Sequence, residues 1–324
     1  MKTYLSGIQS SGLQHLGNYF GAIEKHIRLQ DEEGQKFFFI ADYHALTTSR
    51  DPAQLRERVR ETAVTYLALG LDPERAVLFR QSDVPEVCEL TWLLANHCSM
   101  GLLERAHSYK DKVAKGLAPH AGLFLYPVLM AADILAYDSD IVPVGADQKQ
   151  HVEMTRDMAG SFNASYGEVF RLPDVLFSEH KKVLGVDGEK MSKSYGNDIW
   201  IFESGKRLKK AVGRIKTDSR APDEPKQPES VLLFSFLKLF LGAAELEQWA
   251  TRLRTGGAEG PGYGHLKVRL IEAIDERFAD ARAQREELLA NPGRVDEVLA
   301  AGAEVARERA RATRDRALAA CGLR

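Results

Sequence analysis

Two lysines, two serines and a methionine are grouped in the segment GEKMSKSYGND, residues 188–198. Its glycines, together with Asn197 and Asp198, indicate a loop, and no apolar periodicity suggests that the segment packs in a core. A solvated surface loop would have the same composition. The alternative is a polyphosphate-binding loop, in which Lys190 and Lys193 supply positive charge and the serine hydroxyls donate hydrogen bonds.

A second segment whose residue types could bind a ligand is SGIQSSGLQHLGN, residues 6–18. Its three glycines allow the backbone to approach a ligand closely. His15 and Asn18 place an imidazole and an amide at the expected start of a helix, within reach of a phosphate. The glycine spacing is neither that of a dinucleotide-binding loop nor that of a Walker loop. A single histidine at a helix start carries little functional information when it stands alone.

Alternating strand and helix patterns predict the parallel sheet that would position these segments. We expect strands at residues 3–7, 36–44, 76–83 and 140–145, and helices from Leu16 to before Gly34 and at 52–70, 123–137 and 146–163. In open parallel sheets, ligands bind beyond the carboxyl ends of the strands, where helix N-termini present free N–H groups. Residues 6–18 follow the first strand, so they should lie at that edge.

The pattern changes beyond residue 195, where the strand–helix alternation stops and helical patterns continue to the C-terminus. A second, mostly helical domain is therefore expected to begin near residue 188. We assign the chain to the α/β class, with a Rossmann-like parallel-sheet domain and a smaller all-helical C-terminal domain. The length of 324 residues accommodates two domains.

Bulk composition favours a folded cytosolic protein. Hydrophobic residues make up 44% and charged residues 28% of the chain, and the net charge of −2 leaves room only for a local basic face. The longest apolar stretch, at 123–130, is too short to span a bilayer, and the N-terminus has no signal-like apolar region. Three scattered cysteines form neither a disulfide framework nor a zinc spacing.

Taken together, HLGN at residues 15–18 and KMSKS at 190–194 resemble the two signatures of the class I aminoacyl-tRNA synthetases. The stretches YPVLMAADILAY and DIVPVGADQKQHVEMTRD narrow the resemblance to the bacterial tryptophanyl branch of that class, over nearly the whole chain. Two departures are Ser10, where this branch often has Pro, and Leu5, where it often has an aromatic residue. Leu5 could alter the shape of the amino-acid pocket.

The resemblance implies a tryptophan–tRNA ligase that forms tryptophanyl-adenylate and pyrophosphate from tryptophan and ATP, then esterifies the terminal ribose of tRNA(Trp). It also implies Mg²⁺ held by the ATP phosphates rather than by protein ligands, and a homodimer. The implied parts are a catalytic domain at 1–187, with a dimerisation insertion at roughly 85–135, a tRNA- and anticodon-binding domain at 188–290, and a C-terminal helix at 291–324 that packs back on the catalytic domain.

Residue roles follow from the resemblance in the same way. The residues implied in catalysis are Lys190, Lys193, His15 and Gln9. The residues implied in ATP binding are Gln9, Ser10, Ser11, Gly17, Asn18, Gly145, Ala146, Asp147, Val183, Lys190, Met191, Ser192, Lys193 and Ser194. Asp147 could bind the ribose, although an ordinary helix N-cap would also explain it. Lys112 could add a phosphate contact or lie on a solvated helix face.

The residues implied in tryptophan binding are Asp133, Tyr126, Met130, Gln148, His44 and Gly7. Asp133 stands in the apolar helical stretch LMAADILA, where a carboxylate is costly to bury unless a donor bonds to it. The resemblance assigns it the indole N–H of the substrate, and a neighbouring Arg or backbone group is the alternative. Tyr126 and Gln148 would hold the α-ammonium group, and Met130 would pack on the ring.

Two charged regions point to other contacts. The segment GKRLKKAVGRIK, residues 205–216, is a basic cluster that would track tRNA phosphates, or would simply be a solvated helix face. The arginines of residues 307–316 alternate with acidic residues, as in a salt-bridged helix.

Three rival functions remain open at this point. A tyrosyl-tRNA synthetase would share the fold, but a polar residue would be expected in place of Met130. A small cofactor adenylyltransferase would not need the roughly 130 residues that follow the KMSKS segment. A non-catalytic paralogue would tend to lose the charged loop, whereas Lys190 and Lys193 are both present.

Overall fold

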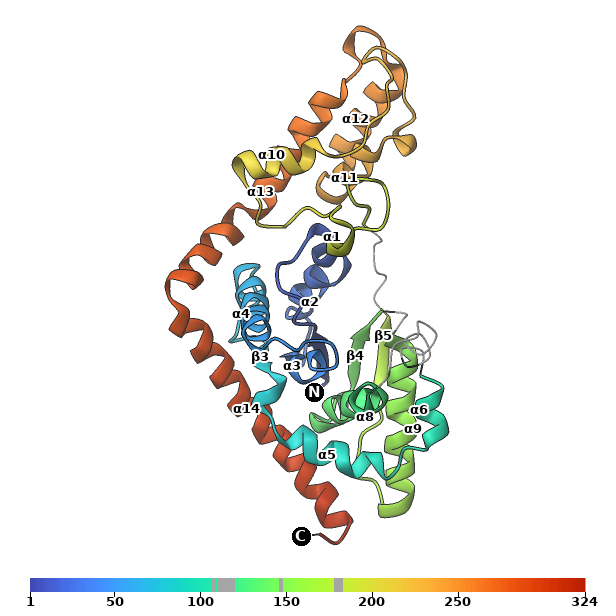
Figure 1. The fold of residues 1–324 in the computed structure, drawn as a ribbon, viewed down its shortest axis with the longest axis vertical. Coiled ribbons are helices and arrows are strands. Elements are labelled where there is room, and N and C mark those ends of the chain that lie inside the picture. Colours follow the sequence, from blue (N-terminus) through green and yellow to red (C-terminus); the bar gives the residue numbers. More distant parts are fainter. Residues whose placement is uncertain (107–108, 110–119, 146–147, 178–182, 324) are drawn as a thin grey trace.

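Among the residues that the structure describes, five parallel strands form a single sheet in the N-terminal half of the chain (Figure 1). In the order β3-β2-β1-β4-β5, they are β1 (Thr3–Ile8), β2 (Gln35–Ile40), β3 (Val77–Arg80), β4 (Ile141–Val144) and β5 (Asp174–Phe177). This computed structural model describes residues 1–106, 109, 120–145, 148–177 and 183–323. The predicted α/β class with helices after the sheet is confirmed. A topological switch point lies between β1 and β4, because the order reverses there.

The sequence did not indicate β5, which among the described residues pairs only with β4, at the edge of the sheet. Its apolar run, residues 175–177, is too short to read as a buried strand from the sequence. Pairing with β4 over Asp174–Phe177 brings the segment into the sheet.

Two strands, β2 and β3, are shorter than predicted, and both end early at their carboxyl ends, where ligands bind to open parallel sheets. β2 ends at Ile40, and α3 (Asp42–Ala45) follows it, while β3 ends at Arg80 and the turn η2 (Gln81–Asp83) follows. The Asp42 carboxylate accepts hydrogen bonds from the backbone N–H groups of Tyr43 (3.0 Å) and Ser82 (2.9 Å). Side chains that bond to the backbone in this way favour turns over continued strand.

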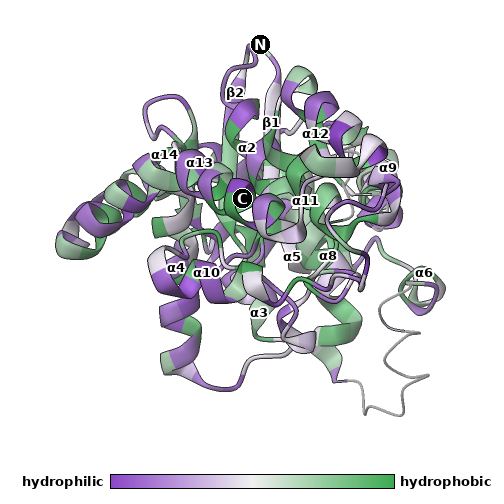
Figure 2. Cartoon of the chain, turned by 90° about the horizontal axis from the view of Figure 1, so that it is seen from above, coloured by the Kyte–Doolittle hydropathy of each residue, from purple (hydrophilic) through white to green (hydrophobic). Residues whose placement is uncertain are grey.

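Helices pack around this sheet. Those of the N-terminal half include α1 (Leu16–Asn18), the π-helical turn η1 (Tyr19–Ile23), α2 (Glu24–Leu29), α4 (Pro52–Ala68), α5 (Glu86–Ala95), α6 (Met100–Glu104), α8 (Ala121–Ala136) and α9 (Lys149–Tyr166). Start signals set the boundaries where they are present. Asp51 accepts from the N–H groups of Ala53 and Gln54, and Pro52 occupies the first position of α4. α8, drawn largely in green in Figure 2, packs against α5 and α9.

The C-terminal part consists of helices joined by turns. They are α10 (Gly205–Gly213), α11 (Leu232–Phe240), α12 (Ala243–Thr255), α13 (Tyr263–Ala290) and α14 (Pro292–Ala320), with the turns η4 (Lys193–Tyr195), η5 (Pro228–Ser230) and η6 (Gly257–Glu259). Figure 1 shows α13 and α14 running along one side of the molecule, from the helical end to the C-terminus beside the sheet half.

α14 lies directly on β3 and α5. A Cβ atom at Gly302 would stand 2.1 Å from the carbonyl oxygen of Leu78, so only glycine permits this approach of helix to strand. The arginines of α14 bond to acidic groups of the sheet half. Arg307 and Arg311 donate to Glu86, which is 1% exposed.

The hydrophobic core does not stop at the predicted domain boundary. One cluster of buried residues includes Tyr4 and Phe38 from the sheet, Ile199 beyond residue 188, and Leu270 and Phe278 from α13. The division at residues 187 and 290 stays a prediction.

Among the helices of the described residues, none combines the length and apolar character that crossing a membrane requires.

Candidate active site

The two signature segments, about 175 residues apart in sequence, are bonded to each other beyond the carboxyl end of β1. The Leu16 N–H donates to the Ile199 carbonyl (3.0 Å), and the Ile201 N–H donates to the Gln14 carbonyl (3.1 Å). The Lys193 Nζ donates to the Ser11 carbonyl at 2.7 Å. The KMSKS ammonium group therefore lies against the backbone of the first loop, at the edge of the sheet where ligands bind.

His15 forms the N-cap of α1 and is 8% exposed. The ring Nδ1 of His15 accepts from the backbone N–H of Asn18 at 3.2 Å, and the backbone N–H of His15 donates to Asn18 Oδ1 at 3.0 Å. The two residues therefore form a reciprocal capping box. Burial lowers the pKa of His15 to about 4; Asp198 opposes this shift and Lys193 adds to it. At neutral pH the imidazole is therefore uncharged, with Nδ1 as acceptor and Nε2 carrying the proton.

Gly17 and Met191 join the two segments a second time. The Gly17 N–H points at Met191 Sδ, 3.3 Å away. A Cβ atom at Gly17 would lie 2.9 Å from the His15 ring, so the close approach requires glycine here. Met191 is 4% exposed, and its N–H donates to the Val183 carbonyl at 3.0 Å. Two of the residues expected at the nucleotide thus also fix the loop.

The KMSKS loop takes its shape from Asn197, which is 2% exposed. Asn197 Oδ1 accepts from the Ser192 N–H at 2.8 Å, and its Nδ2 donates to Asp187 (2.8 Å) and to the Lys190 carbonyl (3.1 Å). Gly196 has a φ angle of 62°, which closes the turn after η4. The predicted loop therefore has a fixed path, whereas the ends of Lys190, Lys193 and Ser194 lie at the surface.

The other residues expected at ATP differ in their setting. Gln9 and Ser11 are exposed, while Ser10 is 8% exposed and its Oγ has no hydrogen-bond partner among the described residues. Gly145 and Gln148 lie where β4 leads into α9, and the Gln148 N–H donates to the Gly145 carbonyl at 3.0 Å. The predicted contacts Ala146, Asp147 and Lys112 lie outside the described residues.

Asp133 lies on α8 with 1% of its surface exposed, and two side chains bond to its carboxylate. His44 Nε2 is 2.9 Å from Oδ2, and Gln81 Nε2 donates to Oδ1 at 2.9 Å and to Oδ2 at 2.8 Å. Burial raises the pKa of Asp133, and the bonds from His44 and Gln81 oppose that shift. The structure thus brings together two of the predicted tryptophan residues and adds Gln81, which sequence reasoning missed.

Tyr126 lies beside the network of Asp133, His44 and Gln81, and its hydroxyl contacts a second residue that the sequence did not indicate. Its hydroxyl bonds to Nε2 of His151, which is 2% exposed on α9, and its ring centroid is 6.2 Å from that of His44 in an edge-to-face arrangement. His151 follows the predicted Gln148 by one turn of α9. That spacing was the only sequence signal that could have pointed to it.

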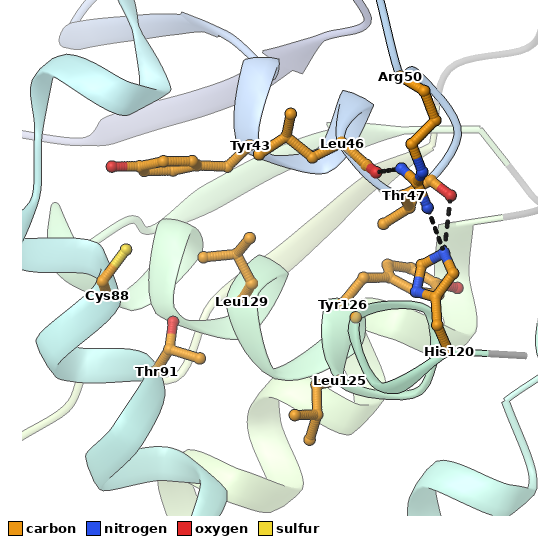
Figure 3. A pocket seen from close by; sticks show the side chains of 11 residues that line it. Tyr43, Leu46, Thr47, Arg50, Cys88, Thr91, His120, Leu125, Tyr126 and Leu129 are labelled. Atoms are coloured by element: carbon orange, nitrogen blue, oxygen red, sulfur yellow. Dashed lines mark hydrogen bonds between the residues drawn. The ribbon is translucent and has the colours of Figure 1, made fainter.

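Two of the residues predicted to bind tryptophan, Met130 and Gly7, make packing contacts within the protein. Met130 is partly buried against the cluster around α8, and Gly7 leaves room for Phe39, whose ring would lie 2.7 Å from a Cβ atom there. Neither Met130 nor Gly7 lines the mostly apolar cavity of about 430 Å³ between α3, α5 and α8. Tyr126 does line it, and Figure 3 shows it across from Cys88 and Thr91. The cavity thus adjoins the Asp133 network without containing it.

Comparison with known proteins now decides the family. A model of "tRNA synthetases class I (W and Y)" matches residues 1–278. The chain belongs to this family. The tryptophan–tRNA ligase of Rhodopirellula baltica is 55% identical over 99% of both chains, and that of Campylobacter jejuni is 50% identical over 94% of both. These two relatives thus match the chain over nearly its whole length.

Solved structures agree with this placement. The tryptophanyl-tRNA synthetase of Campylobacter jejuni, in complex with ADP and tryptophan, has a TM-score of 0.92 and 48% identity, covering 99% of this chain and 100% of that one. The enzyme of Mycoplasma pneumoniae has a TM-score of 0.79 and 32% identity, covering 100% and 98%. The sheet and the long C-terminal helices of this synthetase are thus shared with those enzymes.

Proposed function

We propose that this synthetase is a tryptophan–tRNA ligase, which activates tryptophan with ATP and transfers it to the 3′-terminal ribose of tRNA(Trp). The observation that carries the proposal is the contact of its two signatures, with the Lys193 ammonium 2.7 Å from the Ser11 carbonyl beyond β1. The near-full-length identity to tryptophan–tRNA ligases supports the choice of amino acid.

In the first step, a carboxylate oxygen of tryptophan attacks the α-phosphorus of ATP, and the bond to the β-phosphate oxygen breaks. The products are tryptophanyl-adenylate and pyrophosphate. No side-chain nucleophile is needed, because the substrate supplies it, so the protein acts by positioning and by stabilising charge. Lys190 and Lys193 neutralise the charge that develops on the departing pyrophosphate.

The nucleotide lies over the first loop and the KMSKS loop in this proposal. The uncharged His15 donates its Nε2 hydrogen to a phosphate oxygen, and Ser10 Oγ, buried without a partner among the described residues, gains one when the nucleotide binds. The ADP present in the Campylobacter jejuni complex supports an adenine nucleotide here.

Mg²⁺ would enter on the phosphates of ATP, where it lowers their negative charge. The described residues include no group of three His, Cys, Asp or Glu side chains placed to hold a metal ion. Lys190 and Lys193 would be the protein's own counter-charges to those phosphates.

Tryptophan is recognised at the buried carboxylate in this proposal. Asp133 accepts the indole N–H, and His44 holds Asp133 from the side of α3. Tyr126 and Gln148 bind the α-ammonium group, and Met130 packs on the ring. Met130 offers no polar group to a phenol, which favours tryptophan over tyrosine.

tRNA binding is assigned to the helical part, residues 188–290, with residues 1–187 catalytic and residues 291–324 packed on them. Lys206, Arg207, Lys209 and Lys210 are exposed on α10, which is drawn largely in purple in Figure 2. Arg214 from the same cluster donates to the carbonyls of Gly196 and Asp198, both at 3.0 Å. A phosphate backbone bound at α10 would thus lie near the KMSKS loop.

A homodimer is also proposed, through α5, α6 and α8 and within the expected insertion at roughly 85–135. Trp92 is 72%, Met100 64% and Leu125 41% exposed on these helices, which is a large apolar area for a monomer to leave in water. Light scattering at micromolar concentration should give twice the chain mass of 36.1 kDa. A mass of one chain would contradict the dimer. The cytosolic location stays a prediction from composition.

The function is tested by ATP–pyrophosphate exchange with each of the twenty amino acids. Tryptophan alone should support rapid exchange, and Asp133→Asn should lower kcat/KM for tryptophan sharply while leaving ATP binding and the fold intact. Asp296→Asn is a control, because that carboxylate pairs with Arg60 on the outer surface. Exchange with tyrosine instead, or with no amino acid, would refute the proposal.

A further inference from the structure

Gln81 is buried to the same degree as Asp133, with 1% of its surface exposed, and both ends of its side chain are fixed. Its Oε1 accepts from the backbone N–H groups of Tyr43 (3.1 Å) and His44 (3.4 Å) at the start of α3. Its Nε2 contacts both oxygens of Asp133, at 2.9 and 2.8 Å. The amide thus bridges the ends of β2 and β3 to α8.

This bridge determines how much of the Asp133 carboxylate is left for a ligand. An ionised carboxylate offers about four acceptor positions, two on each oxygen. Gln81 and His44 together make three contacts, two of them to Oδ2 and one to Oδ1. Among the described residues, one acceptor position is therefore left, and it is on Oδ1. Because Asp133 is 1% exposed, water hardly competes for it.

We propose that Gln81 is a positioning residue for amino-acid selection, which holds Asp133 so that a single acceptor position on Oδ1 meets the one N–H of an indole ring. This inference rests on the proposed tryptophan ligase function. An indole ring has a single N–H donor, so it satisfies the one remaining acceptor position on Oδ1. A phenyl ring has no donor and leaves that buried acceptor without a hydrogen bond, which lowers its binding free energy.

The amide is the side chain that this role requires. A carboxylate at position 81 would repel Asp133, and an aliphatic side chain would leave one oxygen with no donor. The glutamine amide supplies a neutral donor to Asp133 and an acceptor to the N–H groups of α3 at once. Its orientation is set by these partners, because the backbone N–H groups can only donate and the carboxylate can only accept.

The test compares tryptophan with 3-benzothienylalanine, in which sulfur replaces the indole N–H with little change of shape. In wild type, kcat/KM in ATP–pyrophosphate exchange should strongly favour tryptophan. Gln81→Met keeps the volume and removes the amide, so that ratio should fall by roughly 10-fold or more, the loss of one hydrogen bond to a charged group. The KM for ATP should change little.

Gln30→Met is the matched control. Gln30 is also buried, at 9% exposed, and bridges backbone groups, since it donates to the Gly70 carbonyl and accepts from the Asp72 N–H. It should lower stability without altering the substrate ratio. If Gln81→Met does not fold, Gln81→Asn serves, because its shorter amide cannot span the same partners.

A second readout is the pH profile. Without the Gln81 donor the charged form of Asp133 loses support, so its pKa rises and the acid limb of kcat/KM for tryptophan should move to higher pH. An unchanged substrate ratio and an unchanged acid limb in Gln81→Met would overturn the inference. A wild-type protein that does not activate tryptophan would instead overturn the proposed function.

Discussion

Replacing His15 by Asn should make the protein less sensitive to mild acid. Burial lowers the pKa of His15 to about 4, against an ordinary value of 6.5, and the unfolded chain regains that ordinary value. Between these two pH values the unfolded state binds the proton and the folded state does not. The free energy of unfolding therefore changes little above pH 6.5, falls as the pH drops toward 4, and levels off below pH 4.

The size of the effect follows from the two pKa values. Linkage gives a loss of about 2 kcal/mol at pH 5 and about 3 kcal/mol below pH 4. Asn is an effective N-cap that does not titrate, so His15→Asn keeps a cap for α1 and removes the titration. The substitution also changes the packing against Gly17, which alters the free energy of unfolding at every pH and therefore not its pH dependence.

Urea unfolding of both proteins at pH 7.5 and pH 5 measures this effect. The loss of unfolding free energy between the two pH values should be smaller in His15→Asn than in wild type by about 2 kcal/mol. Taking the difference between the proteins cancels the titration of all other groups. Equal losses in the two proteins would refute the reasoning, since they would mean that His15 titrates alike in the folded and unfolded states.

Three further predictions concern the site and the C-terminal helix. Lys193→Ala should lower kcat for adenylate formation by the equivalent of roughly 2–4 kcal/mol with a much smaller change in the KM for ATP, and a change in KM alone would mean that the loop only binds. Gly17→Ala should lower the free energy of unfolding, measured by thermal denaturation, by about 1–3 kcal/mol, because the alanine Cβ would lie 2.9 Å from the His15 ring. Glu86→Gln should lower the free energy of urea unfolding by about 1–3 kcal/mol through weakened bonds to Arg307 and Arg311. Glu89→Gln should cost less than about 1 kcal/mol, because the Glu89 carboxylate that pairs with Arg314 is 46% exposed, whereas Glu86 is 1% exposed.

The sequence alone was enough for the fold class and for the two loops that carry charge. Strand and helix patterns are local, so alternating buried strands at 36–44 and 76–83 already implied a parallel sheet, even though both strands end earlier than expected. The motifs HLGN and KMSKS are local as well, and each could be read from consecutive residues. His44 and Asp133 were named from resemblance, and their 2.9 Å contact could not be read from their spacing.

Only the tertiary structure decided which groups meet. Gln81 lies 52 residues from Asp133, and it had no distinguishing signal in its own segment because its role depends on where β3 ends relative to α8. The same holds for Arg214, which reaches the KMSKS loop from α10. A hydrogen bond depends on the distance and direction between two atoms, and the folded path of the backbone sets both, so separation along the chain does not reveal such pairs.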